Sequence, residues 1–162
     1  PRGAGLPPVD LAFPEGETAL RLAKAVAARL RATLGMDVRP VPLGKEGAFR
    51  HMRLSLHGAE GLDPWTFLSA FTSGHEDNLT GWRSGWYDEL VSQASLASDP
   101  AARMDLYRQA ERVLVQDEAP VAPLSFPREG FLLRPRVKGV WANGLGVHPL
   151  RDVWIEPPAG NQ

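Results

Sequence analysis

The hydrophobic period changes twice within the first quarter of the chain. Residues Val9–Phe13 alternate between apolar and polar side chains, which is typical of a short β-strand. Across Glu17–Leu34 the apolar residues recur every three or four positions, which predicts a helix ending at Gly35. Residues 36–41 alternate weakly and predict a second strand at a sheet edge. A strand, a helix and a strand in this order predict a parallel pair joined by a crossover helix.

The next segment predicts a third strand and a short helix. Residues 52–56 place Met52, Leu54 and Leu56 on one face of an extended segment. Residues 64–71 fit one or two turns of helix with Pro64 at the first helical position, where its missing N–H costs nothing.

Two longer helices are predicted after that. The first has an apolar stripe at helical spacing, made of Tyr87, Leu90, Val91 and Ala94. The second begins at Asp99 and Pro100, a capping side chain followed by a favourable first residue. Its inward face is predicted from four residues, Leu106, Ala110, Val113 and Leu114. Three arginines (Arg103, Arg108 and Arg112) are predicted to face outward.

The last part of the chain predicts short extended segments. Residues 121–126 and 131–133 read as strands separated by a turn at 127–130, and residues 137–141 form a last apolar stretch. The order of these elements predicts an α/β chain.

Composition narrows the function classes. The 162 residues suffice for one domain with a real core, and 43% apolar with 23% charged residues is ordinary for a globular protein. The net charge of -1 comes from mixed charges, so we expect no nucleic-acid partner. No apolar run is long enough to span a bilayer, and the absence of cysteine excludes disulfides and thiolate chemistry.

The sequence contains no recognisable catalytic or metal-binding motif. Four histidines (His51, His57, His75 and His148) have no ligand spacing, and we interpret them as surface or loop residues. No serine lies in a GxSxG context, and the glycine pair at 144–146 lacks the following helix of a phosphate-binding loop. We therefore expect no enzyme activity, no cofactor and no bound metal.

Residues 57–87 combine large aromatic side chains with a few polar ones, as a pocket for a peptide or small molecule requires. Phe67, Phe71 and Tyr87 lie at helical spacing and are predicted to fill the core. Trp65 and Trp82 lie in loop-like sequence, where a pocket role and a packing role both remain open.

Four blocks of sequence carry a family resemblance. They are DPWTFLSAF (63–71), DNLTGWRSGWYDELVSQA (77–94), DPAARMDLYRQAERVLVQDEAPVAPLSF (99–126) and RPRVKGV (134–140). In this order and at these separations they resemble the oligopeptide- and dipeptide-binding proteins of ABC importers, a family of extracellular solute-binding proteins. The resemblance implies the C-terminal lobe of a type II periplasmic-binding-protein-like fold, a mixed sheet with flanking helices, whose first lobe is missing.

The same resemblance implies an organisation and a function. Residues 1–127 would form the ligand-binding lobe, and residues 128–162 would cross the hinge and return toward the first lobe. The whole protein would close like a clam shell on a peptide or related small solute and deliver it to the membrane permease of an ABC importer, outside the cytoplasm. We also expect the fragment alone to expose apolar surface through which it can form a homodimer. A ligand-sensing domain of a bacterial regulator, built on the same fold, is the alternative.

The resemblance also implies candidate ligand-binding residues. Glu60 stands where family members present an aspartate to the peptide's ammonium group, and His57 stands where they often have a tryptophan. Asn78 and Trp82 match positions facing the pocket, and Trp65 is the aromatic residue near the predicted anchor. The alternative for Glu60 is an ordinary solvated loop carboxylate.

Overall fold

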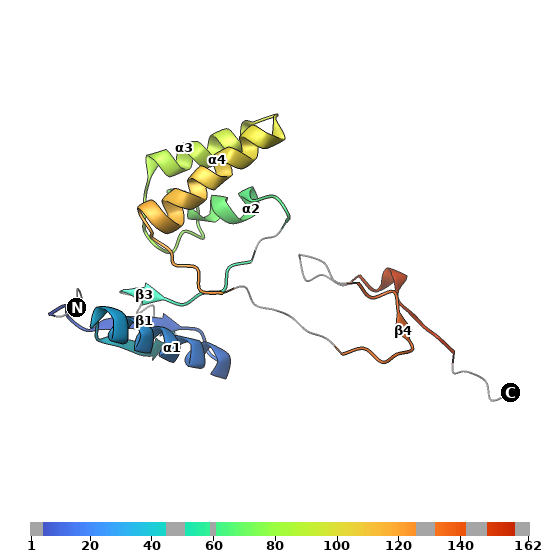
Figure 1. Ribbon diagram of the computed structural model, residues 1–162, viewed down its shortest axis with the longest axis horizontal. Coiled ribbons are helices and arrows are strands. Elements are labelled where there is room, and N and C mark those ends of the chain that lie inside the picture. Colours follow the sequence, from blue (N-terminus) through green and yellow to red (C-terminus); the bar gives the residue numbers. More distant parts are fainter. Residues whose placement is uncertain (1–4, 45–50, 59–60, 126–131, 142–148, 158–162) are drawn as a thin grey trace. The chain divides into compact units, whose positions relative to one another are not determined.

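The computed structural model describes residues 5–44, 51–58, 61–125, 132–141 and 149–157 (Figure 1). The chain divides into two units, Pro1–His57 and Gly58–Gln162. No helix in the described ranges is both long enough and apolar enough to cross a bilayer.

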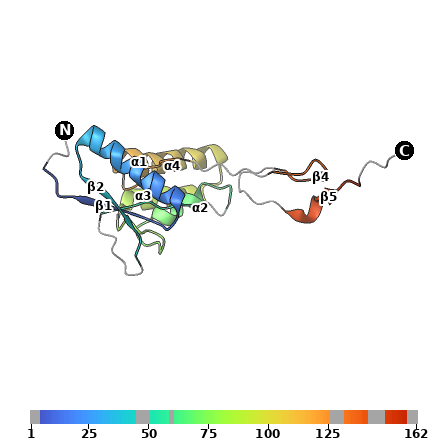
Figure 2. The same ribbon diagram turned by 90° about the horizontal axis from the view of Figure 1, so that it is seen from below.

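The first unit is a small parallel sheet with one crossover helix. Strand β1 (Val9–Phe13) lies between β2 (Val38–Pro42) and β3 (Met52–Arg53), and both neighbours run parallel to it. Helix α1 (Glu17–Leu34) connects β1 to β2 and packs against both strands (Figure 2). The predicted strand–helix–strand unit is therefore confirmed.

The core of this unit follows from the two periodicities. Its buried residues are Leu11, Phe13, Ala23, Ala27, Val38 and Leu54. Small alanines on α1 let the helix lie close to the sheet, because little side-chain volume separates the two backbones. The helix ends where predicted: Gly35 adopts a left-handed φ of 72°, and its N–H donates to the Arg31 carbonyl at 3.0 Å.

The third strand is shorter than predicted. The Leu54 N–H still donates to the Ala12 carbonyl at 2.7 Å, but the strand itself covers only Met52–Arg53. Leu56, which we expected on the buried face, is 80% exposed. The prediction fails there because β1 ends at Phe13 and offers later residues no backbone partner.

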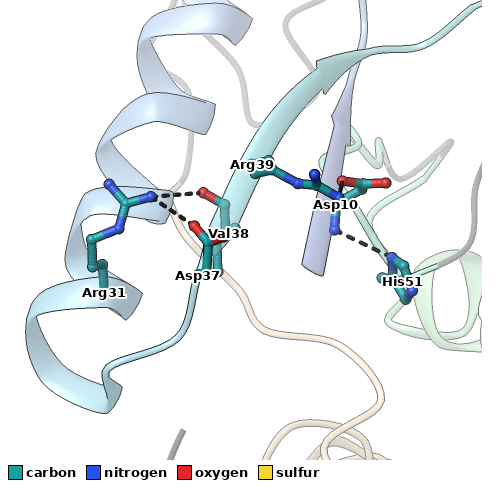
Figure 3. Close-up of polar contacts among 6 residues, drawn as sticks. All are labelled: Asp10, Arg31, Asp37, Val38, Arg39 and His51. Atoms are coloured by element: carbon teal, nitrogen blue, oxygen red, sulfur yellow. Dashed lines mark hydrogen bonds and ion pairs between the residues drawn. The ribbon is translucent and has the colours of Figure 1, made fainter. Parts of the chain in front are cut away.

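Polar contacts secure the edges of this sheet (Figure 3). Arg31 binds the Asp37 carboxylate at 3.1 Å, and Arg39 binds the Asp10 carboxylate at 3.0 Å. The Asp10 N–H donates to Nδ1 of His51 at 3.2 Å. This bond links β1 to the residue that immediately precedes β3. Exposed ion pairs of this kind stabilise a fold by at most about 1 kcal/mol each.

The second unit contains a helical layer. It comprises α2 (Trp65–Leu68), η1 (Ser69–Phe71), α3 (Gly85–Leu96), α4 (Pro100–Arg112) and η2 (Val113–Asp117). Helices α3 and α4 lie side by side (Figure 1). Asp99 caps α4 by accepting the Ala102 N–H at 2.9 Å, and Ser84 caps α3 by accepting the Tyr87 N–H at 3.4 Å.

The core of the helical layer largely confirms the predicted stripes. All four residues predicted on α3 are buried, and so are Phe71, Ala110, Val113 and Leu114. Leu106 was predicted to point inward, but it is only partly buried, and its neighbour Tyr107 is 3% exposed instead. The packed face of α4 runs through residues 107, 110 and 114, which leaves position 106 at its margin.

The last described segment is a two-stranded antiparallel ladder of β4 (Val137–Lys138) and β5 (Trp154–Ile155), preceded by η3 (Leu150–Asp152). Gly139 has a φ of 78°, and an added Cβ would collide with the Asp152 carbonyl. This position therefore requires glycine.

The strands predicted at 121–126 and 131–133 do not appear in their described residues, 121–125 and 132–133. These residues have strand-like composition, but no strand in the described ranges pairs with them, and composition without a partner does not make a sheet. The predicted turn at 127–130 and the glycine pair at 144–146 lie outside the described residues.

Candidate ligand-binding site

The predicted binding residues fall in different places. Glu60 lies outside the described residues, and His57 is an exposed residue at the end of the first unit. Trp65, Asn78 and Trp82 belong to the second unit, where Trp65 lines one depression and the other two line another. The structure therefore brings Asn78 and Trp82 together and leaves Trp65 apart from them.

The depression that holds Asn78 and Trp82 has a volume of about 250 Å³. It is lined by residues of one loop: Ser73, Gly74, His75, Asn78, Gly81, Trp82 and Arg83. We call this the loop pocket. Pockets that enclose a drug-sized ligand measure about 300–1,000 Å³, so the loop pocket suits one group of a larger ligand.

Asn78 organises the wall of the loop pocket. Its side-chain NH₂ donates to the carbonyls of Phe71, Thr72 and Trp82 at 3.2, 3.0 and 3.0 Å. Its carbonyl oxygen accepts from the Thr80 hydroxyl at 2.7 Å and from the Thr80 N–H at 3.2 Å. Both ends of the amide are occupied inside the loop, so Asn78 shapes the pocket and has little hydrogen-bonding capacity left for a ligand.

Trp82 is held from several sides. Its N–H donates to the Thr80 hydroxyl at 3.0 Å, and its indole Nε1–H donates to the Glu118 carboxylate at 2.7 Å. Its ring lies edge-on to Tyr87, with the ring centroids 5.0 Å apart. Both roles considered for Trp82 are thus present, because the residue packs on the core and also lines the pocket.

The second depression, of about 200 Å³, lies around Asp63 and is lined by Trp65, Ser95, Arg103 and Tyr107. Trp65 is 46% exposed. The Trp65 N–H, which donates to the Asp63 carboxylate at 2.9 Å, is the main cause that lowers the pKa of Asp63. The Tyr107 hydroxyl and the Arg103 guanidinium at 3.4 Å lower that pKa further. Burial, and then the hydrogen bond to Asp63, raise the pKa of Tyr107.

Asp63 therefore joins α2 to α4, which agrees with the structural role expected of an aspartate turn at a helix start. Arg103 was predicted to face solvent. Its side chain is partly exposed, and its guanidinium forms an ion pair with Asp63. Within the described ranges we find no group of three acidic or histidine side chains that would hold a metal ion. The described site offers aromatic surface and fixed hydrogen-bonding groups, which suit binding.

Sequence reasoning missed Glu118. It lies 36 residues after Trp82, yet its carboxylate binds both the Trp82 indole and the Ser84 hydroxyl. Nothing in a single sequence links such distant positions, because the contact depends on how the end of α4 packs beside the loop before α3.

Comparisons with known proteins identify relatives. No family model matches the chain. The chain is 31% identical to the dipeptide-binding protein DppE of Bacillus subtilis over 153 residues, which are 90% of this chain and 28% of that protein. It is also 31% identical to the periplasmic murein peptide-binding protein MppA of Escherichia coli, over 81% of this chain and 26% of that protein.

Solved structures give the same result. The murein tripeptide binding protein MppA of Escherichia coli superposes with a TM-score of 0.77 at 30% identity, covering 91% of this chain and 30% of that chain. A peptide-bound OppA of Listeria monocytogenes, at 18% identity and a TM-score of 0.73, shares the fold. The chain thus spans about three tenths of the length of these proteins. It belongs to the family of dipeptide- and oligopeptide-binding proteins and represents a part of their type II periplasmic-binding fold.

Proposed function

We propose that this chain is part of an extracytoplasmic binding protein that captures peptides and delivers them to the permease of an ABC importer. The observation that carries the proposal is the 31% identity to a dipeptide-binding protein over 90% of the chain. The named relatives are binding proteins and not enzymes, and none of them favours the alternative of a regulator's sensing domain.

The geometry of the second unit supports a contribution to one side of a ligand site. Trp82 is one of the residues that line the loop pocket, and Asn78 holds the backbone of the loop. Residues 1–127 would form the ligand-binding lobe, and residues 128–162 would cross the hinge and return to the first lobe. Exposed apolar side chains at Leu132, Trp154 and Ile155 fit a tail that another part of the protein covers.

The experiment for this function uses the intact protein of which this chain is a part. A pool of unmodified di- to pentapeptides is incubated with the protein, and mass spectrometry identifies the peptides that remain bound after gel filtration. We expect enrichment of particular peptides, and calorimetry should show that an N-acetylated copy of the most enriched one binds poorly. No enrichment from the pool, or none beyond that of an unrelated protein, would refute peptide capture.

Glu60 is the proposed anchor for the ligand's ammonium group. When the lobes close and exclude water, an ion pair becomes stronger than at an open surface. Glu60→Gln should weaken binding of the enriched peptide by roughly 30-fold or more, because a desolvated charge loses its partner. Glu111→Gln is the matched control, since Glu111 is an exposed glutamate on α4. If Glu60→Gln and Glu111→Gln bind within twofold of wild type, Glu60 is an ordinary loop residue.

The lone chain should behave differently from the intact protein. One lobe keeps only part of the contacts while most of the cost of association remains, so we expect weak peptide binding or none. Its exposed apolar residues also favour a homodimer of the fragment at high concentration, which sedimentation equilibrium would detect. A strictly monomeric fragment would contradict the dimer, and micromolar binding would contradict the divided site.

A further inference from the structure

We propose that Glu118 is a positioning residue that fixes the indole ring of Trp82 as the rigid wall of the loop pocket. The part of this proposal that concerns ligand affinity rests on the proposed function. The part that concerns the orientation of Trp82 stands on the contacts alone.

The Glu118 carboxylate uses one oxygen for each of two residues in the same loop. Oε2 accepts from the Trp82 indole Nε1–H at 2.7 Å, and Oε1 accepts from the Ser84 hydroxyl at 3.0 Å. A carboxylate bound through both oxygens has a fixed plane as well as a fixed position. The indole distance is short enough for a strong hydrogen bond, whereas the Ser84 distance lies at the long limit of an ordinary O–H···O bond.

The carboxylate is the hydrogen-bond partner of the indole ring itself. The bonds from Asn78 and to Thr80 involve the backbone of Trp82 and therefore fix the chain, not the ring. The edge-on contact with Tyr87 and the packing on the buried cluster hold the apolar part of the ring. The indole N–H is the single polar group of the ring, and its hydrogen bond selects one side-chain rotamer.

Ser84 extends the effect of Glu118 to the start of α3. The Ser84 hydroxyl has one proton, and donating it to Glu118 leaves a lone pair free for the Tyr87 N–H. The carboxylate therefore sets the direction of the helix cap as well as that of the indole. In this way Glu118 ties the end of η2 to the loop that forms the pocket.

Two observations distinguish this role from a purely structural one. Glu118 is itself exposed and lies outside the buried cluster, so its side chain adds no apolar packing to the core. It also does not line the pocket, whereas Trp82 does, so any effect on a ligand passes through Trp82.

The test follows the indole signal of Trp82 in the nitrogen–proton NMR spectrum of the intact protein. Trp82→Phe identifies that signal by its disappearance from the spectrum. In Glu118→Ala we expect the Trp82 signal to move more than the other indole signals and its N–H to exchange faster with solvent. Glu118→Gln keeps one acceptor oxygen without the charge and should show a smaller change. Glu111→Gln, the matched control on α4, should leave the signal in place.

Affinity is measured in the same variants with the peptide most enriched from the pool. We expect Glu118→Ala to weaken binding about tenfold, because binding must then order the freed Trp82 side chain, with kinetics dominated by faster dissociation. An unmoved Trp82 signal in Glu118→Ala and Glu118→Gln would overturn the proposal. A moved signal with unchanged affinity would overturn the role in binding. If the wild type binds no peptide, peptide capture fails, and the Trp82 signal alone decides the role of Glu118.

Discussion

The substitution Tyr87→Phe removes one hydroxyl group from the centre of the helical layer and tests the hydrogen bond that joins α3 to α2. Tyr87 on α3 is fully buried, and its hydroxyl donates to the Leu68 carbonyl of α2 at 2.7 Å. Burial, and then the nearby Asp88 charge, raise the pKa of Tyr87 above its usual range. The phenol is therefore a neutral donor at every physiological pH.

The expected cost of Tyr87→Phe follows from what the change leaves in place. Phenylalanine keeps the ring and its edge-on contact with Trp82, so the variant opens almost no cavity. It removes the hydrogen bond and leaves the Leu68 carbonyl without that donor in a buried place. Such a loss costs about 1–3 kcal/mol, a large part of the 5–15 kcal/mol that stabilises a typical domain.

Urea unfolding followed by tryptophan fluorescence measures this cost at pH 7. The buried hydroxyl also predicts that stability falls at alkaline pH, because the folded chain holds the Tyr87 proton more tightly than the unfolded chain does. The free energy of unfolding should be fully present below about pH 10 and fall as the pH rises further. Tyr107, whose pKa is also raised, acts in the same direction, so Tyr87→Phe should reduce this slope without abolishing it.

If Tyr87→Phe lowers the free energy of unfolding by less than about 0.5 kcal/mol, as an ordinary surface substitution does, the buried hydrogen bond does not have the expected effect. An unchanged alkaline slope in Tyr87→Phe would show that the phenol proton is not held differently in the folded chain.

Further changes test other elements. Leu114→Ala should cost about 2–5 kcal/mol in urea unfolding, because this side chain is fully buried, whereas Leu106→Ala should cost less at the margin of the packed face; equal losses would contradict that difference. Asp99→Ala should cost about 0.5–2 kcal/mol through loss of the α4 cap, and Asp99→Ser should restore most of it. Gly139→Ala should disrupt the β4–β5 ladder, because the new Cβ collides with the Asp152 carbonyl; unchanged amide exchange across this ladder would contradict the close approach.

The elements that the sequence predicted well are those whose signals are local. The helix Glu17–Leu34 has one period along its whole length and a glycine at its end, and both of its bounds match the structure. The α4 start was predictable because Asp99 and Pro100 each favour it for an independent reason. Such features depend on residues a few positions apart, so one sequence contains the information.

The elements that were wrong depend on distant partners. Residues 121–125 are apolar enough for a strand, but pairing decides whether an extended segment joins a sheet. The exposure of Leu56 has the same origin, since its neighbour β1 ends too early to pair with it. On α4, Tyr107 is buried where Leu106 was expected, although Ala110, Val113 and Leu114 are buried as predicted, because the neighbouring helices set the margin of the packed face.

The loop pocket shows how a candidate site can be located from sequence while its working parts remain hidden. An aromatic side chain in loop-like sequence indicated Trp82, with a pocket role and a packing role both open, and a family pattern indicated Asn78 as a residue facing the ligand. The structure shows the Asn78 amide turned inward and Trp82 anchored by Glu118. A pocket wall built in this way is fixed before a ligand arrives, so binding need not spend free energy on ordering it. Because that order depends on a hydrogen bond to an exposed carboxylate, the shape of the pocket can change by a single substitution that leaves the core of the helical layer intact.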